Sequence, residues 1–351
     1  VPVAVIALIL VAKAKIVEER HPAPMDKTGL VLVVGGMGLS VLGFQQASQW
    51  GWDDVATWAC ILGGLLLLVV FAVVEQRKEN PLIRVSIFRN RAFTVENLVL
   101  FFSMVAFIPL FFFASMYAQI ALGNSVSEAG LYLLTFFAGF AVASQFGGRI
   151  LDGVGAKPAV VLGCVVAAVG FALWGNELPE LSYNSQWYFI VLAGAGMGLM
   201  LGPSNTDAIN RAPRVNYGEV SGVTQTVRNY GASLGLAVLG TILISVNPSN
   251  IEASLGQLGV PTTQADAIAQ SFTQSGGGSA SASFKQQAGA KAEQIFQAVQ
   301  VDFGESTRIV FFVMAGAMVV TALVALVGLR AGRQEQLVDD PAPASPPLSP
   351  S

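Results

Sequence analysis

The chain has 351 residues, of which 53% are hydrophobic and 12% are charged, and its formal net charge is −3. Because a soluble domain has about 25% charged residues, this composition excludes an ordinary soluble globular protein. The Lys and Arg residues are spread over short segments rather than gathered on one face, which argues against nucleic-acid binding. The single His21 and the widely separated Cys60 and Cys164 form no metal-binding or disulfide pattern.

Apolar segments dominate the chain from its first residue. Residues 1–12 form an apolar run shorter than the roughly 20 residues that a membrane helix needs, so we interpret them as the truncated end of a transmembrane helix. Eight longer segments follow. Each is a continuous apolar run, which predicts a membrane-spanning helix rather than an alternating strand. They cover residues 28–44, 55–74, 94–118, 127–148, 159–174, 187–206, 219–246 and 308–329.

Small residues and two polar stretches complete the predicted organisation. Glycines 194, 196 and 198, and glycines 231, 235 and 240, are expected at tight helix contacts. Residues 247–307 are predicted to be a long extracytoplasmic loop with a Gly- and Ser-rich centre, and helical spacing in 284–301 predicts a surface helix at its flank. The Pro- and Ser-rich tail, 330–351, is expected to be disordered.

Basic residues alternate consistently between the two ends of the predicted helices. Fifteen of the 19 lie on one side, and the loops of the other side carry only Lys285, Lys291 and Arg308. Because basic loops stay in the cytoplasm, we expect that side and the C-terminus to be cytoplasmic. All five Trp residues are expected near the outer boundary of the membrane, where amphipathic rings anchor helices.

The turn between the fourth and fifth predicted helices has the pattern Gly-x-x-x-Asp-x-x-Gly-x-Lys. Gly148 is expected to let a neighbouring helix approach closely, and Gly155 to take a backbone angle that other residues avoid. Asp152 is expected to accept hydrogen bonds near the start of the next helix, and Arg149 and Lys157 to face the cytoplasm. The alternative is an ordinary glycine-rich turn with two snorkelling bases.

This turn resembles the loop motif of the major facilitator superfamily, with Ile150 replacing a Leu and Ala156 replacing the first base. Residues 81–93 resemble the loop before the ninth helix of that superfamily's fourteen-helix drug:proton antiporters, and residues 222–235 resemble their thirteenth helix. The resemblance covers nearly the whole chain, with the matches in the family's order.

The resemblance implies an all-α polytopic membrane protein with the major facilitator fold. After the truncated stub it places two extra central helices in 28–74 and a C-terminal six-helix bundle in 93–329. It also implies that Asp152, Arg149 and Lys157 act as a gate latch, holding the cytoplasmic ends of two helices together until the inside opens.

Ionisable and polar residues inside the predicted helices are candidates for the substrate cavity, which the resemblance implies is lined by the third, fourth, sixth and seventh helices. The candidates are Asn97, Phe101, Met104, Gln225, Arg228 and Asn229. The alternatives are packing or lipid-facing surface for the apolar residues, and a shallow, snorkelling position for Arg228. Interfacial solvation is expected for Glu96 and Asp207, and the main proton-carrying carboxylate is expected in a missing N-terminal half.

We therefore expect a secondary active transporter of the cell membrane that exports small amphipathic or drug-like compounds by proton antiport, with a monomer favoured. No cofactor or metal is expected, and the chain has no nucleotide-binding motif. One alternative is an exporter of a lipid, siderophore or metabolite. Another is a membrane scaffold or sensor acting through 247–307. An enzyme is not expected, because no His cluster or nucleophile–base pair occurs.

Overall fold

A computed structural model describes residues 26–78, 81–210, 217–257 and 292–332. Within these ranges eight helices are long and apolar enough to cross a membrane, which confirms the predicted all-α membrane fold. They are α2 (Lys27–Trp50), α3 (Val55–Glu75), α4 (Arg91–Ile120), α5 (Val126–Val154), α6 (Ala156–Glu177), α7 (Tyr183–Asn210), α8 (Tyr217–Gln257) and α11 (Ala292–Gly328). The 3-10 helices η1 (Val85–Arg89) and η2 (Leu178–Glu180) precede α4 and follow α6. The predicted stub 1–12 and nearly all of the tail 330–351 lie outside the described residues.

Helices α2 to α5 each begin at a polar capping residue that precedes the apolar run. Asp26, Asp54 and Asn90 each accept a backbone N–H from the first turn of α2, α3 and α4. Ser125 and Glu128 form a reciprocal capping box at the start of α5. Side-chain caps satisfy the donors that a helix start leaves unpaired, so these helices extend beyond the hydrophobic core that hydropathy detects.

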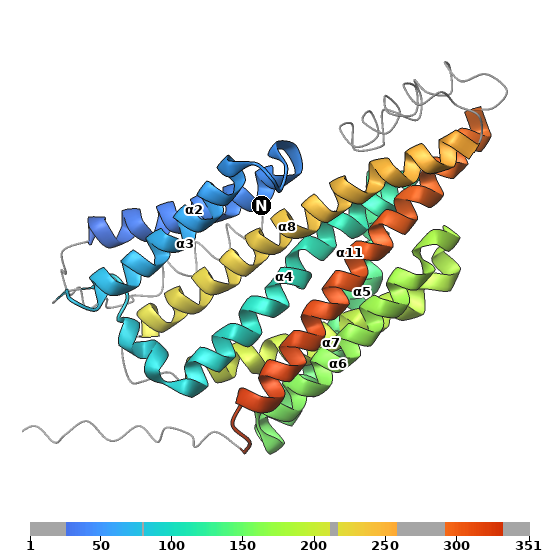
Figure 1. Ribbon diagram of the computed structural model, residues 1–351. Helices are drawn as coiled ribbons and strands as arrows, with labels where there is room; N and C mark the ends of the chain where they lie inside the picture. Colours follow the sequence, from blue (N-terminus) through green and yellow to red (C-terminus); the bar gives the residue numbers. More distant parts are fainter. Residues whose placement is uncertain (1–25, 79–80, 211–216, 258–291, 333–351) are drawn as a thin grey trace, which may run out of the picture.

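The helices form one bundle with a pair of helices at its side (Figure 1). Helix α4 packs against α8, α11, α7 and α5, and α7 packs along both α5 and α6. Helices α2 and α3 pack on each other, and α2 attaches the pair to α8. Two hydrogen bonds join α2 to α8: the Ser40 and Tyr230 hydroxyls lie 2.9 Å apart, and Thr241 donates to the Phe44 carbonyl.

Glycines permit the closest helix contacts, as the sequence predicts. A Cβ on Gly194 or Gly198 would meet the backbone of α5, and one on Gly196 would meet the backbone of α6. Gly231 and Gly235 lie in the same way against the carbonyls of α4. The prediction is confirmed at these five positions. It is wrong at Gly240, where a Cβ would have no neighbour within 4 Å.

The last two helices differ from the prediction of a loop over 247–307. Helix α8 continues to Gln257 and α11 begins at Ala292, while 258–291 lies outside the described residues. At about 1.5 Å per residue, both helices are longer than the roughly 30 Å hydrocarbon layer. Their extensions pair through apolar residues buried at helical spacing, and Ser254 donates to Asp302 at 2.7 Å. Because the extensions contain polar residues, their hydropathy is too low for the sequence to indicate that the two helices continue.

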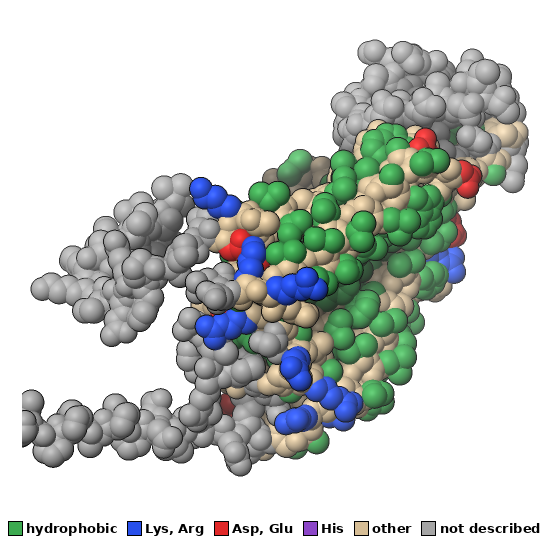
Figure 2. Space-filling view, turned by 60° about the vertical axis from the view of Figure 1, so that its left-hand side comes forward, with side chains coloured by type: hydrophobic (Ala, Val, Ile, Leu, Met, Phe, Trp, Pro, Cys, Tyr) green, Lys and Arg blue, Asp and Glu red, His purple; other side chains and the backbone are tan. Residues whose placement is uncertain are grey.

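Basic side chains mark one end of the bundle, which we call the basic end (Figure 2). The described Lys and Arg residues there lie at the starts of α2, α4 and α6 and at or after the ends of α3, α5 and α11. In Figure 2 a largely hydrophobic flank separates this end from the other. The arrangement agrees with the charge alternation in the sequence.

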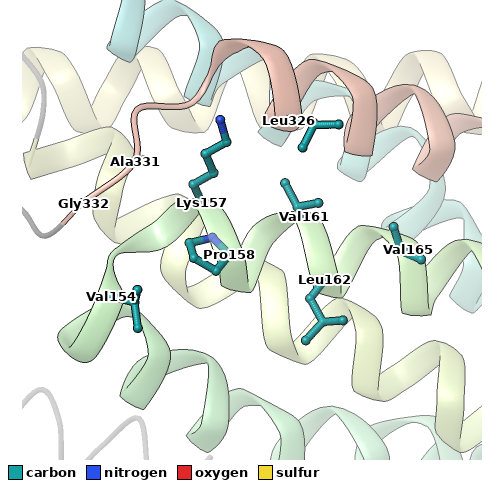
Figure 3. A pocket seen from close by; sticks show the side chains of 9 residues that line it. All are labelled: Val154, Lys157, Pro158, Val161, Leu162, Val165, Leu326, Ala331 and Gly332. Carbon is teal, nitrogen blue, oxygen red and sulfur yellow. The ribbon is translucent and has the colours of Figure 1, made fainter.

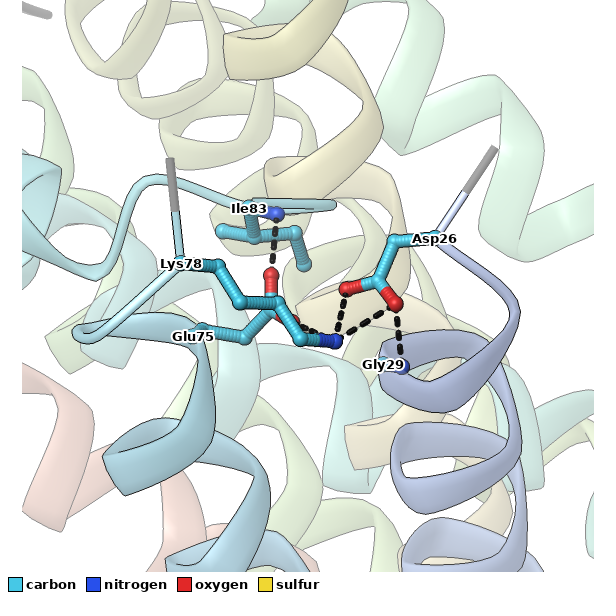
Figure 4. Close-up of polar contacts among 5 residues, drawn as sticks. All are labelled: Asp26, Gly29, Glu75, Lys78 and Ile83. Atoms are coloured by element: carbon cyan, nitrogen blue, oxygen red, sulfur yellow. Dashed lines mark hydrogen bonds and ion pairs between the residues drawn. The ribbon is translucent and has the colours of Figure 1, made fainter. Parts of the chain in front are cut away.

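An ion-pair cluster ties the helix pair together at the basic end (Figure 4). Lys78 lies 2.6 Å from both carboxylate oxygens of Asp26 and 3.6 Å from Glu75. The second Glu75 oxygen accepts the backbone N–H of Ile83 at 3.1 Å. The Gly29 N–H and the Lys78 ammonium stabilise the ionised form of Asp26, and they hold its pKa below the usual range.

A neutral hydrogen-bond network closes the opposite end of the bundle. The Gln186 amide accepts from Tyr132 at 2.7 Å and donates to Tyr117 at 2.8 Å. Tyr117 donates to the Leu178 carbonyl, and Trp174 donates to Tyr132. The sequence prediction for Trp174 as a boundary anchor is wrong, because its side chain is 0% exposed inside the bundle. The other four Trp residues are exposed.

Candidate functional site

The predicted latch turn joins α5 to α6 through the single residue Gly155. Gly155 has φ 103° and ψ 175°, a conformation that side-chain-bearing residues rarely adopt. Its N–H donates to the carbonyls of Ile150 and Leu151, at 3.2 and 3.0 Å, and closes the end of α5. The turn therefore requires glycine at position 155, as the motif predicts.

The other motif residues lie around this turn on the basic end. Arg149 and Asp152 are exposed near the end of α5, and the Arg149 guanidinium lies 5.7 Å from the centre of the Phe146 ring. Gly148 meets no neighbouring helix of the described chain. The close helix contact falls instead on Gly147, where a Cβ would lie 2.5 Å from the Leu199 carbonyl oxygen of α7.

Lys157 lies at the mouth of an apolar groove of about 530 Å³ between α6 and the end of α11 (Figure 3). Pro158, Val161 and Leu162 on α6 form part of its wall. Leu326 and the segment 331–332 contribute from the α11 side. The motif thus has exposed charges around a glycine turn, with one of its bases beside an apolar surface.

Two of the three candidates on α4 are buried in the bundle. Asn97 and Met104 are 3% and 2% exposed, and Asn97 donates to the Phe93 carbonyl of its own helix at 2.9 Å. Phe101 is partly exposed, and its ring centre lies 6.0 Å from that of Tyr230 on α8. Because α8 lies so close to α4, Asn97 and Met104 contribute to helix packing rather than to an open wall.

The three candidates on α8 lie together within about one helical turn. Gln225 and Asn229 are exposed, and the Gln225 amide donates to Asn229 at 3.0 Å. Arg228 is half-buried and turns toward α7, where it donates to Asn205 at 3.5 Å. Asn229 also lines a groove of about 450 Å³ between α2 and α8. The α8 candidates are therefore exposed or half-buried, whereas Asn97 and Met104 on α4 are buried.

The structure reveals a buried acidic site that the sequence prediction assigned to the membrane interface. Glu96 on α4 and Asp207 on α7 are 0% and 1% exposed. The Ser204 hydroxyl of α7 donates to the Glu96 carboxylate at 2.7 Å. The expectation of interfacial solvation is wrong because both side chains are buried where the end of α7 packs against the start of α4. A Ser three residues before an Asp in an apolar helix is the available sequence signal.

No metal-binding group of three or more His, Cys, Asp or Glu side chains occurs in the described parts of the chain. The described site therefore consists of a glycine turn with charged residues, a polar patch on α8 and buried carboxylates at the basic end. These groups lie on helices that are long and apolar enough to cross a membrane.

Comparison with known proteins agrees with the family resemblance that the sequence motifs indicate. The sequence model of the Major Facilitator Superfamily matches residues 4–236. The tetracenomycin C resistance and export protein of Streptomyces glaucescens is 30% identical over 251 residues, which are 70% of this chain and 46% of that protein. The multidrug transporter protein MdtP of Bacillus subtilis is 27% identical over 245 residues, covering 69% and 45%. The cephamycin export protein CmcT of Amycolatopsis lactamdurans is 30% identical over 254 residues, covering 69% and 51%.

The chain spans about half the length of these curated relatives. The family match includes the whole latch turn, helices α2 to α7 and the first half of α8. Together with eight membrane-length helices, it confirms the resemblance noted in the sequence. This chain is a multi-pass membrane protein and belongs to the Major Facilitator Superfamily.

Proposed function

We propose that the full-length protein exports small amphipathic compounds across the cell membrane by proton antiport. The observation that carries the proposal is the polar patch of Gln225, Arg228 and Asn229 on the membrane-length helix α8. Polar residues within membrane helices usually face a bundle interior or a water-filled cavity. The relatives named as export and resistance proteins support an organic compound as the cargo.

The patch offers contacts suited to amphipathic solutes. Gln225 and Asn229 supply exposed amides, and the Phe101 and Tyr230 rings lie beside them on α4 and α8. Amide groups orient a polar portion of a ligand, while aromatic faces accept flat apolar or cationic portions. The groove between α2 and α8 extends this surface with further polar side chains.

The basic end is proposed to face the cytoplasm, as the positive-inside rule predicts. In this orientation the latch turn lies at the cytoplasmic ends of α5 and α6, and the chain leaves α11 on the same side. The exposed Arg149 and Asp152 are proposed to hold the inner gate closed and to separate when it opens.

Transport by the full-length protein in proteoliposomes tests this proposal. A lipophilic fluorescent cation serves as cargo, and its movement is measured with and without an imposed pH gradient. Gln225→Leu combined with Asn229→Leu is expected to reduce transport roughly tenfold, the scale of one lost polar contact in a binding site. Gln119→Leu is the matched control, because among the described residues this amide on α4 bonds only to Ser115 of its own helix.

The outcomes distinguish the alternatives. Transport that ignores the pH gradient in the wild type would contradict proton antiport. Full activity of the double variant would contradict the role of the α8 patch. If the cation moves poorly and a lipid, siderophore or metabolite competes with it, the cargo class of the proposal is wrong.

A further inference from the structure

We infer that Glu96 is the carboxylate of this chain that binds the transported proton, between α4 and α7 near the basic end. The inference rests on the proposed antiport and names the residue that carries its proton in this half of the transporter. Glu96 is the sixth residue of α4, and its side chain is 0% exposed. Ser204 of α7 donates to its Oε2 atom at 2.7 Å.

The chemistry of this contact permits both protonation states. An ionised carboxylate away from water is costly unless hydrogen bonds or charges stabilise it. The Ser204 hydroxyl donates to Glu96 when the carboxylate is ionised, and it can accept from Glu96 when the carboxyl is protonated. One hydroxyl rotation therefore keeps the α4–α7 contact hydrogen-bonded in either state, as a group that gains and loses a proton requires.

Charged and titratable groups approach this position from several helices. On α7, Asp207 is buried one turn closer to the basic end, and on α6 Cys164 lies within electrostatic range of Glu96. On α8, Arg228 donates a hydrogen bond to Asn205, and the Glu219 carboxylate accepts the backbone N–H of Arg84. The exposed charged groups at this end include Arg91 of α4, Arg149 and Asp152 of α5, and Arg330 after α11. A buried carboxylate and a cation therefore lie on the helices that pack around Glu96.

The sequence of α7 connects this proton site to the proposed substrate patch. Ser204 bonds to Glu96 on α4, and the next residue, Asn205, bonds to Arg228 on α8. Pro203 immediately precedes both and removes a backbone donor from the helix, which makes this segment a natural point of bending. A change of charge on Glu96 therefore acts on the same short segment that positions Arg228.

Infrared difference spectroscopy of the purified full-length protein tests proton binding directly, without transport. Lowering the pH is expected to produce the C=O stretching band of a protonated, buried carboxylic acid. Glu96→Gln should remove that band. Glu75→Gln is the matched control, because Glu75 is also buried at the basic end but belongs to the Asp26–Lys78 cluster. A spectrum in which Glu96→Gln and the wild type show the same bands overturns the inference.

Transport measurements then separate this inference from the proposed function. Glu96→Gln is expected to lose pH-driven accumulation by roughly tenfold or more, while exchange of substrate across equal pH continues. If the wild type itself ignores a pH gradient, the antiport proposal fails and the infrared result still decides whether Glu96 binds a proton. If the wild type responds and Glu96→Gln responds equally, antiport stands and Glu96 is not its carrier.

Ser204→Ala provides a test that keeps the carboxylate in place. Without this donor the ionised form of Glu96 is less stabilised, so the pH profile of transport should move to higher pH. Ser103→Ala removes an equally buried hydroxyl that, within the described part of the chain, bonds only to Leu100 of its own helix, and it should leave the profile unchanged. Identical profiles for both variants overturn the inference.

Discussion

The two ends of the bundle bury different kinds of polar group. At the end opposite the basic one, Tyr117, Tyr132, Trp174 and Gln186 join α4, α5, α6 and α7 through neutral hydrogen bonds. At the basic end, the buried groups are carboxylates, and the latch turn between α5 and α6 carries exposed charges.

The difference concerns what each end can do. A neutral network whose members satisfy one another has a single favourable arrangement and does not respond to pH. Buried carboxylates and exposed ion pairs change their interactions when a proton or a charged partner arrives. We therefore interpret the neutral end as the static part of the bundle and the basic end as the part that changes during transport.

The largest effect should come from removing the aromatic centre of the neutral end. Trp174 packs edge-on to Phe311, with ring centres 4.7 Å apart, and donates to Tyr132. Trp174→Ala should lower the free energy of unfolding by about 3–5 kcal/mol, because it leaves a large cavity and removes one of the hydrogen bonds of the Tyr132 hydroxyl. Thermal unfolding of the purified protein measures this loss. The exposed Trp187 at the same end provides the control, and Trp187→Ala should cost under about 1 kcal/mol. Equal losses would contradict the static role of the network.

The second prediction places a carboxylate in the neutral network. Gln186→Glu should be tolerated at low pH, where a protonated Glu resembles Gln in shape and hydrogen bonding. As the pH rises, ionisation becomes costly because the network contains no described Lys or Arg. Stability should then fall with pH by up to about 1.4 kcal/mol per unit, the limit for one titrating group. Thermal melting of the variant and the wild type over a pH series measures the slope, and parallel curves would show that this end tolerates a charge.

The third prediction concerns the latch turn at the basic end. Asp152→Asn should slow transport by roughly tenfold while leaving membrane insertion and thermal stability unchanged, because Asp152 is exposed and its charge is proposed to act on the gate. Asp53→Asn, at an exposed position in the turn between α2 and α3, is the matched control. Transport assays on proteoliposomes with equal protein content compare the two. Wild-type transport by Asp152→Asn would remove Asp152 from the gate.

The helices were predictable from the sequence because a continuous apolar run is a local property. The extensions of α8 and α11 were not, since polar residues such as Ser254 and Asp302 lower hydropathy while the residues between them pair the two helices. The requirement for glycine at 155 was predictable because a turn of one residue needs its backbone freedom. These successes and failures follow from whether a feature depends on neighbours in sequence or in space.

The candidate site was harder to predict because the face of each helix depends on its partners. Helix α4 is apolar almost all round, so its sequence does not indicate that α8 covers Asn97 and Met104 or that α7 covers Glu96. Gln225 and Asn229 were identifiable because amides are rare in such a helix. The link from Ser204 to Glu96 joins positions far apart in sequence, and only the packing of α4 on α7 brings them together.

The smallest predicted effect lies outside both ends, in the cluster that holds α2 to α3. The pKa of Asp26 is lowered by the Gly29 N–H and by Lys78, so the folded state holds the ionised form. The stabilisation is complete above the ordinary Asp value of about 3.9, and it is lost as the pH falls through the lowered pKa. After correction for the intrinsic pH dependence of amide exchange, hydrogen exchange of the first turn of α2 should therefore accelerate at low pH, by the few-fold typical of an accessible ion pair.

Asp26→Asn should show the faster exchange already at neutral pH and little further change on acidification. Asp54→Asn is the matched control, because Asp54 caps α3 through the Ala56 N–H but pairs with no described base. A pH response that persists in Asp26→Asn would assign it to another group and leave Asp26 with capping alone. A response confined to α2 would instead show that the helix pair stays in place without this ion pair. The contacts of α3 with α2, and of α2 with α8, would then be enough to hold it.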